Sequence, residues 1–202
     1  MQKQLIISSL IGAFIGGGVM VWYQNDTTRG VTEITRYQST DGSWMPHNRS
    51  DHMGMMQQMF VTSERDFIEH MIPHHQEAID TASEVLERGG TTVEMRDLMN
   101  NIITAQTAEI ESMKTWYETW YGETYEDTGE YQPMMRELAN FREVKLDQVF
   151  LEDMIMHHMG AIMMARSIQP YIEHNEMTEL TINIVGTQSA EIVQMRQMLQ
   201  GL

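Results

Sequence analysis

Cysteine is absent from this chain of 202 residues, which excludes both a disulfide framework and a thiolate metal site. Proline is scarce, at four residues, and the plentiful Met, Glu and Gln favour helices over a sheet sandwich. Basic residues are few, since 13 Lys and Arg face 29 Asp and Glu, for a formal net charge of -16. This charge disfavours nucleic acid as a partner and makes cations the natural ones, unless the acidity serves solubility alone.

Methionine is abundant by contrast, at 21 residues. Its flexible thioether commonly fills irregular gaps in a hydrophobic core. It is also a soft ligand for copper(I) that cannot form disulfides in an oxidising compartment. Composition therefore leaves two interpretations open, core packing and soft-metal binding.

An uncharged apolar run at residues 5–23 follows Lys3 and ends in Trp22 and Tyr23. The run is long enough for a helix that spans a bilayer, and the aromatic pair suits the membrane interface. We expect residues 1–24 to be an uncleaved membrane anchor, because no A-x-A-like cleavage site follows the run. Lys3 places the amino terminus in the cytoplasm, so the rest of the chain would be periplasmic or otherwise extracytoplasmic. It would be anchored to the inner membrane, or secreted if the segment is cleaved.

Residues 25–61 are polar and lack sustained periodicity, which indicates a linker. The end of this linker concentrates soft metal ligands: His47, His52, Met53, Met55, Met56 and Met59. Because a linker has little to bury, these side chains are candidate ligands on a Met- and His-rich arm. The alternative is that the arm docks along the rest of the protein as a short helix.

The remainder, residues 62–202, contains an internal repeat. Residues 67–79 align with 150–162 at an offset of 83, and 106–113 align with 188–195 at an offset of 82. The repeating unit is two helices and a connection, so two helical hairpins would form a four-helix bundle in an all-α fold. Helix start and stop signals predict helices at about residues 63–88, 92–121, 147–168 and 178–199, with a short helix at 134–141.

Each repeat carries the same candidate metal ligands, a methionine followed by a histidine pair: Met71, His74 and His75, then Met154, His157 and His158. On a helix, residues three and four apart lie together, so each thioether and its imidazoles are at chelating distance. His70 and Asp153 flank the two pairs at equivalent positions.

Glu109 and Glu191 stand at equivalent positions on the second and fourth helices. They would orient the imidazoles without binding the metal themselves. The structural alternative is that each histidine is a core residue hydrogen-bonded to one of these glutamates. We favour metal binding, because two adjacent histidine pairs, each preceded by Met, recur in both repeats.

Thioether and imidazole together favour soft or borderline ions, copper(I) above all, whereas hard cations prefer oxygen. Zinc or copper(II) is an alternative at the histidine pairs alone. A di-iron site is disfavoured because neither repeat has Glu three residues before its histidine pair. A further trio, Met156, Met159 and Met163, falls on the other side of the third helix, either as a surface metal site or as packing beneath the linker.

The motifs resemble a known family. His-Met-Ile-Pro-His-His-Gln at 70–76 and Asp-Met-Ile-Met-His-His at 153–158, each followed by Gln-x-Ala-Glu-Ile-x-x-Met, are similar to domain of unknown function 305. The resemblance covers about residues 62–200 and implies a ferritin-like four-helix fold. It also implies copper resistance by sequestering or handing on copper(I), with silver(I) as a mimic. The resemblance further implies that six residues are metal ligands: Met71, His74, His75, Met154, His157 and His158.

Copper ions are the predicted partners, with a copper exporter or a periplasmic copper sensor as the candidate protein partner. Two other functions stay open. A bundle oxidase could use the same histidines, and a purely structural membrane-anchored bundle would bind no metal. We expect no enzyme, because the chain has neither a G-x-S-x-G nucleophile motif nor a phosphate-binding glycine loop.

Overall fold

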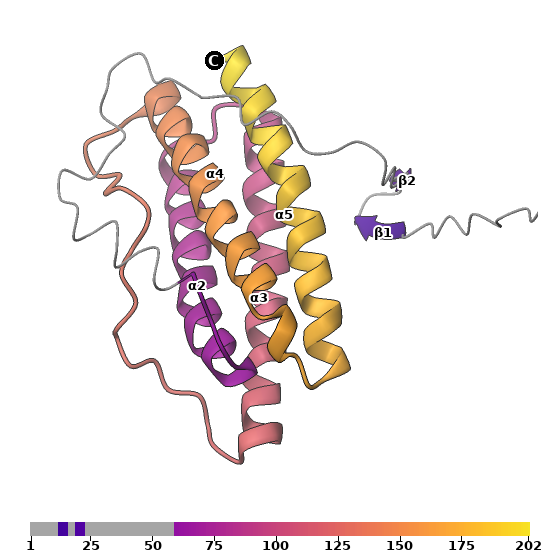
Figure 1. Ribbon diagram of the computed structural model, residues 1–202. Helices are drawn as coiled ribbons and strands as arrows, with labels where there is room; N and C mark the ends of the chain where they lie inside the picture. Colours follow the sequence, from indigo (N-terminus) through magenta and orange to yellow (C-terminus); the bar gives the residue numbers. More distant parts are fainter. Residues whose placement is uncertain (1–11, 16–18, 23–58) are drawn as a thin grey trace, which may run out of the picture. The chain divides into compact units, whose positions relative to one another are not determined.

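The computed structural model describes residues 12–15, 19–22 and 59–202 (Figure 1). The chain divides into two units, residues 1–45 and 46–202, each compact by itself. Most of the predicted Met- and His-rich arm lies outside the described residues, namely His47, His52, Met53, Met55 and Met56.

The first unit contains a small antiparallel pair of strands, β1 (Gly12–Ile15) and β2 (Val19–Trp22), with Ile15 opposite Val19. Residues 12–15 and 19–22 are strands where we expected part of a membrane-spanning helix, and the rest of residues 5–23 lies outside the described residues. The β-branched and aromatic side chains of these strands favour extended backbone, and the glycines between the strands are poor helix formers. None of the helices in the described ranges is both long and apolar enough to cross a bilayer.

The second unit is a bundle of four helices connected as two helical hairpins (Figure 1). The helices are α2 (Glu64–Arg88), α3 (Val93–Tyr121), α4 (Glu143–Ser167) and α5 (Asn175–Gly201), with a short 3-10 helix, η1 (Gln169–Tyr171), before α5. Helix α2 packs against α3, α4 packs against α5, and the contact of α2 with α4 joins the hairpins. The predicted four-helix architecture is confirmed for residues 59–202.

Local sequence signals define several helix ends. The Ser63 side chain accepts a hydrogen bond from the backbone N–H of Asp66 at 3.1 Å, and Thr92 does the same for Met95 at 3.1 Å. Gly122 ends α3 in the left-handed conformation that favours glycine, with φ of 71°.

The connection between α3 and α4, residues 122–142, runs back along the outside of the bundle (Figure 1). The short helix expected at 134–141 does not form. Backbone N–H groups of this stretch donate to side chains of the bundle instead, those of Met134 and Met135 to Glu77 and that of Arg136 to Asp153. These bonds supply the partners that a helix would otherwise provide. Helix α4 then begins at Glu143, four residues before its expected start.

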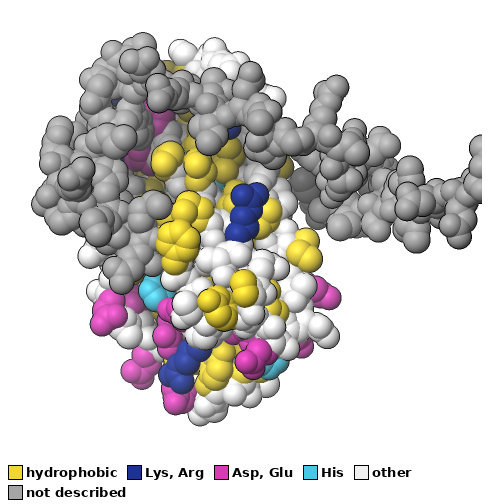
Figure 2. All heavy atoms as spheres, viewed as in Figure 1, with side chains coloured by type: hydrophobic (Ala, Val, Ile, Leu, Met, Phe, Trp, Pro, Cys, Tyr) yellow, Lys and Arg dark blue, Asp and Glu magenta, His cyan; other side chains and the backbone are white. Residues whose placement is uncertain are grey.

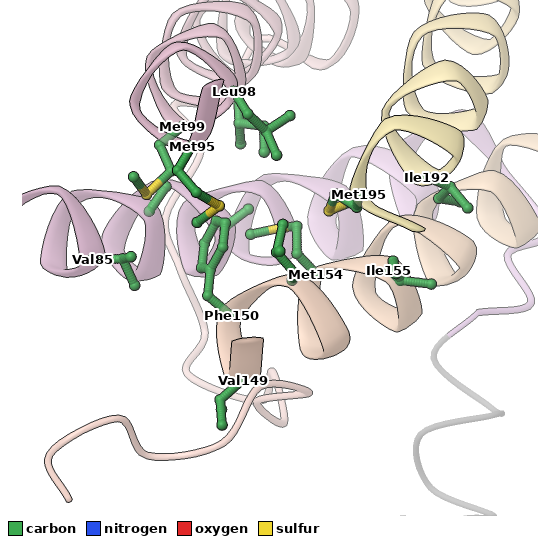
Figure 3. Packing of buried hydrophobic residues seen from close by; sticks show 14 of the residues in the cluster. Val85, Met95, Leu98, Met99, Val149, Phe150, Met154, Ile155, Ile192 and Met195 are labelled. Carbon is green, nitrogen blue, oxygen red and sulfur yellow. The ribbon is translucent and has the colours of Figure 1, made fainter. Parts of the chain in front are cut away.

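Two hydrophobic clusters fill the bundle. One joins the C-terminal half of α2 to the N-terminal half of α4, and includes Val85 and Phe150 (Figure 3). The other joins the N-terminal half of α2 to the C-terminal half of α4, and includes Phe67 and Ile168. The histidine pairs fall between the two clusters on both helices, so a polar layer crosses the middle of the core.

A buried carboxylate near the start of α2 and of α4 holds the turn of the opposite hairpin. The contacts are equivalent in the two halves: Asp147 accepts from the backbone N–H of Gly90 at 2.8 Å and of Thr91 at 2.9 Å, and Glu64 accepts from those of Glu173 and His174, both at 2.9 Å. Corresponding residues are 83 apart in the sequence, so the repeat extends to these contacts. We call them the reciprocal clamps.

Candidate metal centre

Four imidazoles form the polar layer. His74 and His75 come from α2, His157 and His158 come from α4, and all four residues are at most 1% exposed. The rings of His74 and His157 lie against each other, with centroids 3.7 Å apart and planes inclined by 34°. The ring centroid of His75 lies 6.1 Å from that of His74, and the ring centroid of His158 lies 6.4 Å from that of His157. The structure therefore brings the two predicted pairs together from opposite hairpins.

The two outer imidazoles are hydrogen-bonded to carboxylates of neighbouring helices. His75 Nε2 donates to Glu109 Oε2 of α3, and His158 Nε2 donates to Glu191 Oε2 of α5, both at 2.7 Å. With the proton held on Nε2, the neutral ring carries its lone pair on Nδ1. This is the arrangement in which a carboxylate orients a metal-binding histidine.

Six imidazole nitrogens of the layer have no hydrogen-bond partner, namely Nδ1 of His75 and His158 and both nitrogens of His74 and His157. His157 Nε2 lies 3.3 Å from Glu77 Oε2, without the geometry of a hydrogen bond. Each unpaired buried polar group costs about 1–3 kcal/mol. A fold that retains six of them has a reason beyond packing. A metal ion bound through ring nitrogens would supply the missing partner, so the residues present fit such an ion.

The protonation of the inner pair suits metal binding. Burial lowers the pKa of His74 well below its ordinary value, and the neighbouring His157 and His75 lower it further. Burial also lowers the pKa of His157, although Glu77 opposes the shift. Both rings are therefore neutral near pH 7, which is the form in which imidazole binds metals.

Glu77 of α2 connects the histidine layer to the loop at residues 122–142. Its oxygens accept hydrogen bonds from the Tyr131 hydroxyl at 2.6 Å and from the backbone N–H groups of Met134 and Met135, each at 2.9 Å. Burial acts to raise the pKa of Glu77, but His157 and these donors outweigh it, so the pKa is lowered. Glu77 is thus an ionised group that holds the loop against the histidine layer.

Three residues beside the layer were not predicted from the sequence: Glu77, Tyr131 and Met134. The Tyr131 ring approaches that of His74 edge-on, with centroids 6.1 Å apart. The sequence does mark Glu77 as unusual, because the equivalent residue of the second repeat is Gly160 and the two repeats differ at this position. The loop residues follow no periodic pattern, so spacing could not identify them.

Three of the predicted methionine ligands, Met59, Met71 and Met154, are packed in the core. Met154 lies among hydrophobic side chains near Phe150 of its own helix and Met195 of α5 (Figure 3). Met71 and Met59 belong to the other cluster, so the buried chain begins before residue 62. Among the residues described, no three His, Asp or Glu side chains are arranged to hold a metal ion by themselves.

The flanking residues His70 and Asp153 align in the repeat but have different partners. His70 Nδ1 lies 2.8 Å from the backbone oxygen of Asp66 and 3.1 Å from its carboxylate, and the His70 side chain is 38% exposed. Asp153 is buried and binds the Arg136 guanidinium at 2.9 Å. Their role as metal ligands stays a prediction.

The methionine trio of α4 reaches the surface. Met156 is 50% exposed and Met159 is 39% exposed, while Met163 is half-buried. Hydrophobic side chains reach the surface on the face over α4 and α5 (Figure 2). This placement leaves the thioethers accessible, and a metal site formed by them also stays a prediction.

Comparison with known proteins identifies a family and several similar structures. The family model for a domain of unknown function, DUF305, matches residues 19–117 and 64–199. No curated protein matches the chain.

Solved structures of CopM are similar to this chain. The Cu(II)-bound form is 38% identical, has a TM-score of 0.65, and the alignment covers 70% of this chain and 99% of that one. The Cu(I)-bound form is also 38% identical, with a TM-score of 0.63 over 70% and 98% of the two chains. CopM has also been solved in Ag-bound forms. A DUF305 fragment from Deinococcus radiodurans is 27% identical, with a TM-score of 0.61 over 71% and 99% of the two chains.

Proposed function

The chain belongs to the DUF305 family, and from this starting point we propose that it binds copper(I) within its four-helix bundle. The observation that carries the proposal is the buried layer of four histidines with six unpaired ring nitrogens. Similarity to CopM, which has been solved with bound copper and silver, supports the same function. Binding, and not catalysis, is the proposed activity.

Ligand chemistry supports copper(I) over other ions. The inner imidazoles are neutral, the chain has no cysteine, and thioethers are the available soft ligands. Neutral nitrogen and sulfur ligands suit a soft monovalent ion, whereas hard cations need oxygen ligands. Silver(I), which is similarly soft, would occupy the same site as a mimic.

Within this proposal, His75 and His158 bind through Nδ1, while Glu109 and Glu191 hold the opposite side of each ring. His74 and His157 bind through nitrogens that have no other partner. The methionines of the two repeats, Met71 and Met154, are kept as candidate ligands.

We further propose that the protein acts outside the cytoplasm, where it sequesters copper(I) or hands it on and so contributes to copper resistance. Methionine in place of cysteine supports this location, because thioethers do not form disulfides under oxidising conditions. The uncharged run at residues 5–23 supports it as well, as a segment that directs export. Cell fractionation of the full-length protein, with and without residues 1–24, would test the location.

Competition against a chromogenic copper(I) chelator tests the central proposal. The full-length protein would be compared with a variant in which His74, His75, His157 and His158 are changed to Ala, and with Gln76→Ala, at an exposed position of the same helix, as the control. We expect tight binding in the wild type and in the control, and loss of most binding in the fourfold variant. Binding that survives in the fourfold variant would return the histidines to a structural role.

A further inference from the structure

Gly160 of α4 lies close against the His74 imidazole. A Cβ atom at this position would lie 3.1 Å from His74 Nε2 and 3.3 Å from the sulfur of Met134. A side chain here would crowd both groups, so glycine lets a nitrogen of α2 and a thioether of the loop at residues 122–142 approach the same point of α4. His74 Nε2 is buried and has no hydrogen-bond partner.

The repeat shows what this position could have held. Gly160 aligns with Glu77 at the offset of 83 residues. Glu77 places a carboxylate oxygen 3.3 Å from His157 Nε2, and Gly160 lies at the matching position beside His74 Nε2. One inner histidine thus faces a carboxylate, while its counterpart faces a thioether. The two halves of the bundle therefore place different kinds of ligand beside the inner imidazoles, a hard carboxylate oxygen in one and a soft thioether sulfur in the other.

Met134 is held firmly in this place. Its backbone N–H donates to both carboxylate oxygens of Glu77, at 2.9 and 3.1 Å, and two residues further the Arg136 N–H donates to Asp153 at 3.0 Å. Helices α2 and α4 therefore fix the loop on both sides of the methionine. A ligand that is already in position loses little conformational freedom when it binds.

We propose that the Met134 sulfur and His74 Nε2, which both border Gly160, bind one copper(I) ion together. The proposal rests on the proposed function and names a ligand from outside the repeated helices. Because both donor atoms border the same glycine, a small movement of the flexible methionine side chain would bring them to metal-bond lengths, roughly 2.0 Å to nitrogen and 2.3 Å to sulfur in the case of zinc. Thioether and neutral imidazole are both ligands that copper(I) accepts.

Replacement of Met134 by Leu tests the proposal, because Leu keeps the volume and removes the sulfur. Met135→Leu is the matched control, since Met135 is equally half-buried and its N–H binds the same carboxylate. In the full-length protein, we expect Met134→Leu to lower copper(I) affinity about tenfold or more and Met135→Leu to leave it unchanged. X-ray absorption at the copper edge should show one sulfur ligand fewer in Met134→Leu.

Gly160→Ala gives an independent readout. The added methyl group would press against His74 Nε2 and the Met134 thioether and force one of them to move, so we expect copper(I) affinity to fall. The apo protein should keep its helical circular dichroism spectrum, because Ala is the better helix former.

Copper(I) binding that is lost in His74→Ala but unchanged in Met134→Leu would overturn this proposal and leave the proposed function intact. A wild-type protein that binds no copper(I) would overturn both.

Discussion

At the scale of single residues, Glu77 serves the histidine layer and the loop at once. Its carboxylate faces His157 on one side and accepts hydrogen bonds from three donors on the other, the Tyr131 hydroxyl and the backbone N–H groups of Met134 and Met135. A carboxylate is needed there because all of these partners are donors, or can be.

Glu77→Gln should weaken this arrangement without changing its shape. The amide replaces one acceptor oxygen by a donor, so at least one N–H or O–H of the loop loses its partner. We expect the free energy of unfolding, measured with urea, to fall by about 1–3 kcal/mol. Glu87→Gln, at an exposed position of the same helix, should change it by less than about 0.5 kcal/mol. Equal stability of the two variants would contradict the role of Glu77 in holding the loop.

The neutral inner histidines make the stability of the metal-free protein depend on pH. The pKa values of His74 and His157 are lowered by burial, whereas in the unfolded chain both rings titrate near 6.5. Below that pH the two imidazoles bind protons in the unfolded state but not in the folded state. Stability should therefore fall as the pH drops from 7.5 toward 5, by up to about 1.4 kcal/mol per pH unit for each imidazole.

Urea unfolding of the metal-free protein at several pH values would measure this slope. Glu77 does not contribute to this slope between pH 7.5 and 5. Its pKa is lowered in the folded protein, so the stability that it contributes is lost only when the pH falls below its ordinary pKa of 4.5. His74→Gln should give a shallower slope than the wild type. An unchanged slope would mean that the folded protein accepts a proton on His74.

At the scale of elements, the reciprocal clamps fasten each hairpin to the other. Asp147 is fully buried and Glu64 is 5% exposed, and each accepts two backbone N–H groups. Neither was selected from the sequence, since their partners lie 56 to 110 positions away and leave no local pattern.

Asp147→Ala should remove one clamp. The N–H groups of Gly90 and Thr91 would lose their acceptor, and we expect the free energy of unfolding to fall by about 2–4 kcal/mol. Asp97→Ala, at an exposed position of α3, serves as the control. Copper(I) affinity should stay the same in both variants wherever they are folded. A loss of affinity without a loss of stability would place Asp147 in the metal site instead.

The outer face of α4 offers a separate test. Changing Met156, Met159 and Met163 together to Leu keeps a hydrophobic surface but removes three thioethers. If these methionines form a surface site, the copper(I) stoichiometry should fall by one equivalent, as measured by titration with a chelator present. An unchanged stoichiometry would leave the trio as packing residues.

Sequence periodicity could predict the helices and the histidine layer, because both depend on spacing within one helix. The ends of α2 and α3 follow from Ser63, Thr92 and Gly122, whose preferences are local. The loop at 122–142 could not be predicted, since it is held by side chains distant in sequence. Met134, the methionine of this loop that lies near His74, was therefore not predicted as a ligand. The strands β1 and β2 were missed because an apolar run has no period that separates strand from helix.

At the scale of the whole molecule, metal binding and stability are linked. An ion that binds the folded state alone stabilises it by about 2.7 kcal/mol when its concentration is one hundred times Kd. For a protein of this size, that corresponds to a rise in Tm of about 5–10 °C. Thermal unfolding with copper(I) or silver(I) should show this shift, and Mg²⁺ should not. No shift for the wild type, or the same shift after His74 and His157 are changed to Ala, would contradict binding in the histidine layer.

The reciprocal clamps also bear on how such a bundle could have arisen. Every clamp joins one hairpin to the other, so a hairpin alone would leave its carboxylate without these donors and its turn without this acceptor. A single ancestral hairpin would have satisfied these contacts only against a second copy of itself. The present chain thus carries the geometry of a homodimer within one polypeptide. Because one polypeptide carries both halves, the halves can differ, and Glu77 opposite Gly160 is a difference that identical subunits could not have.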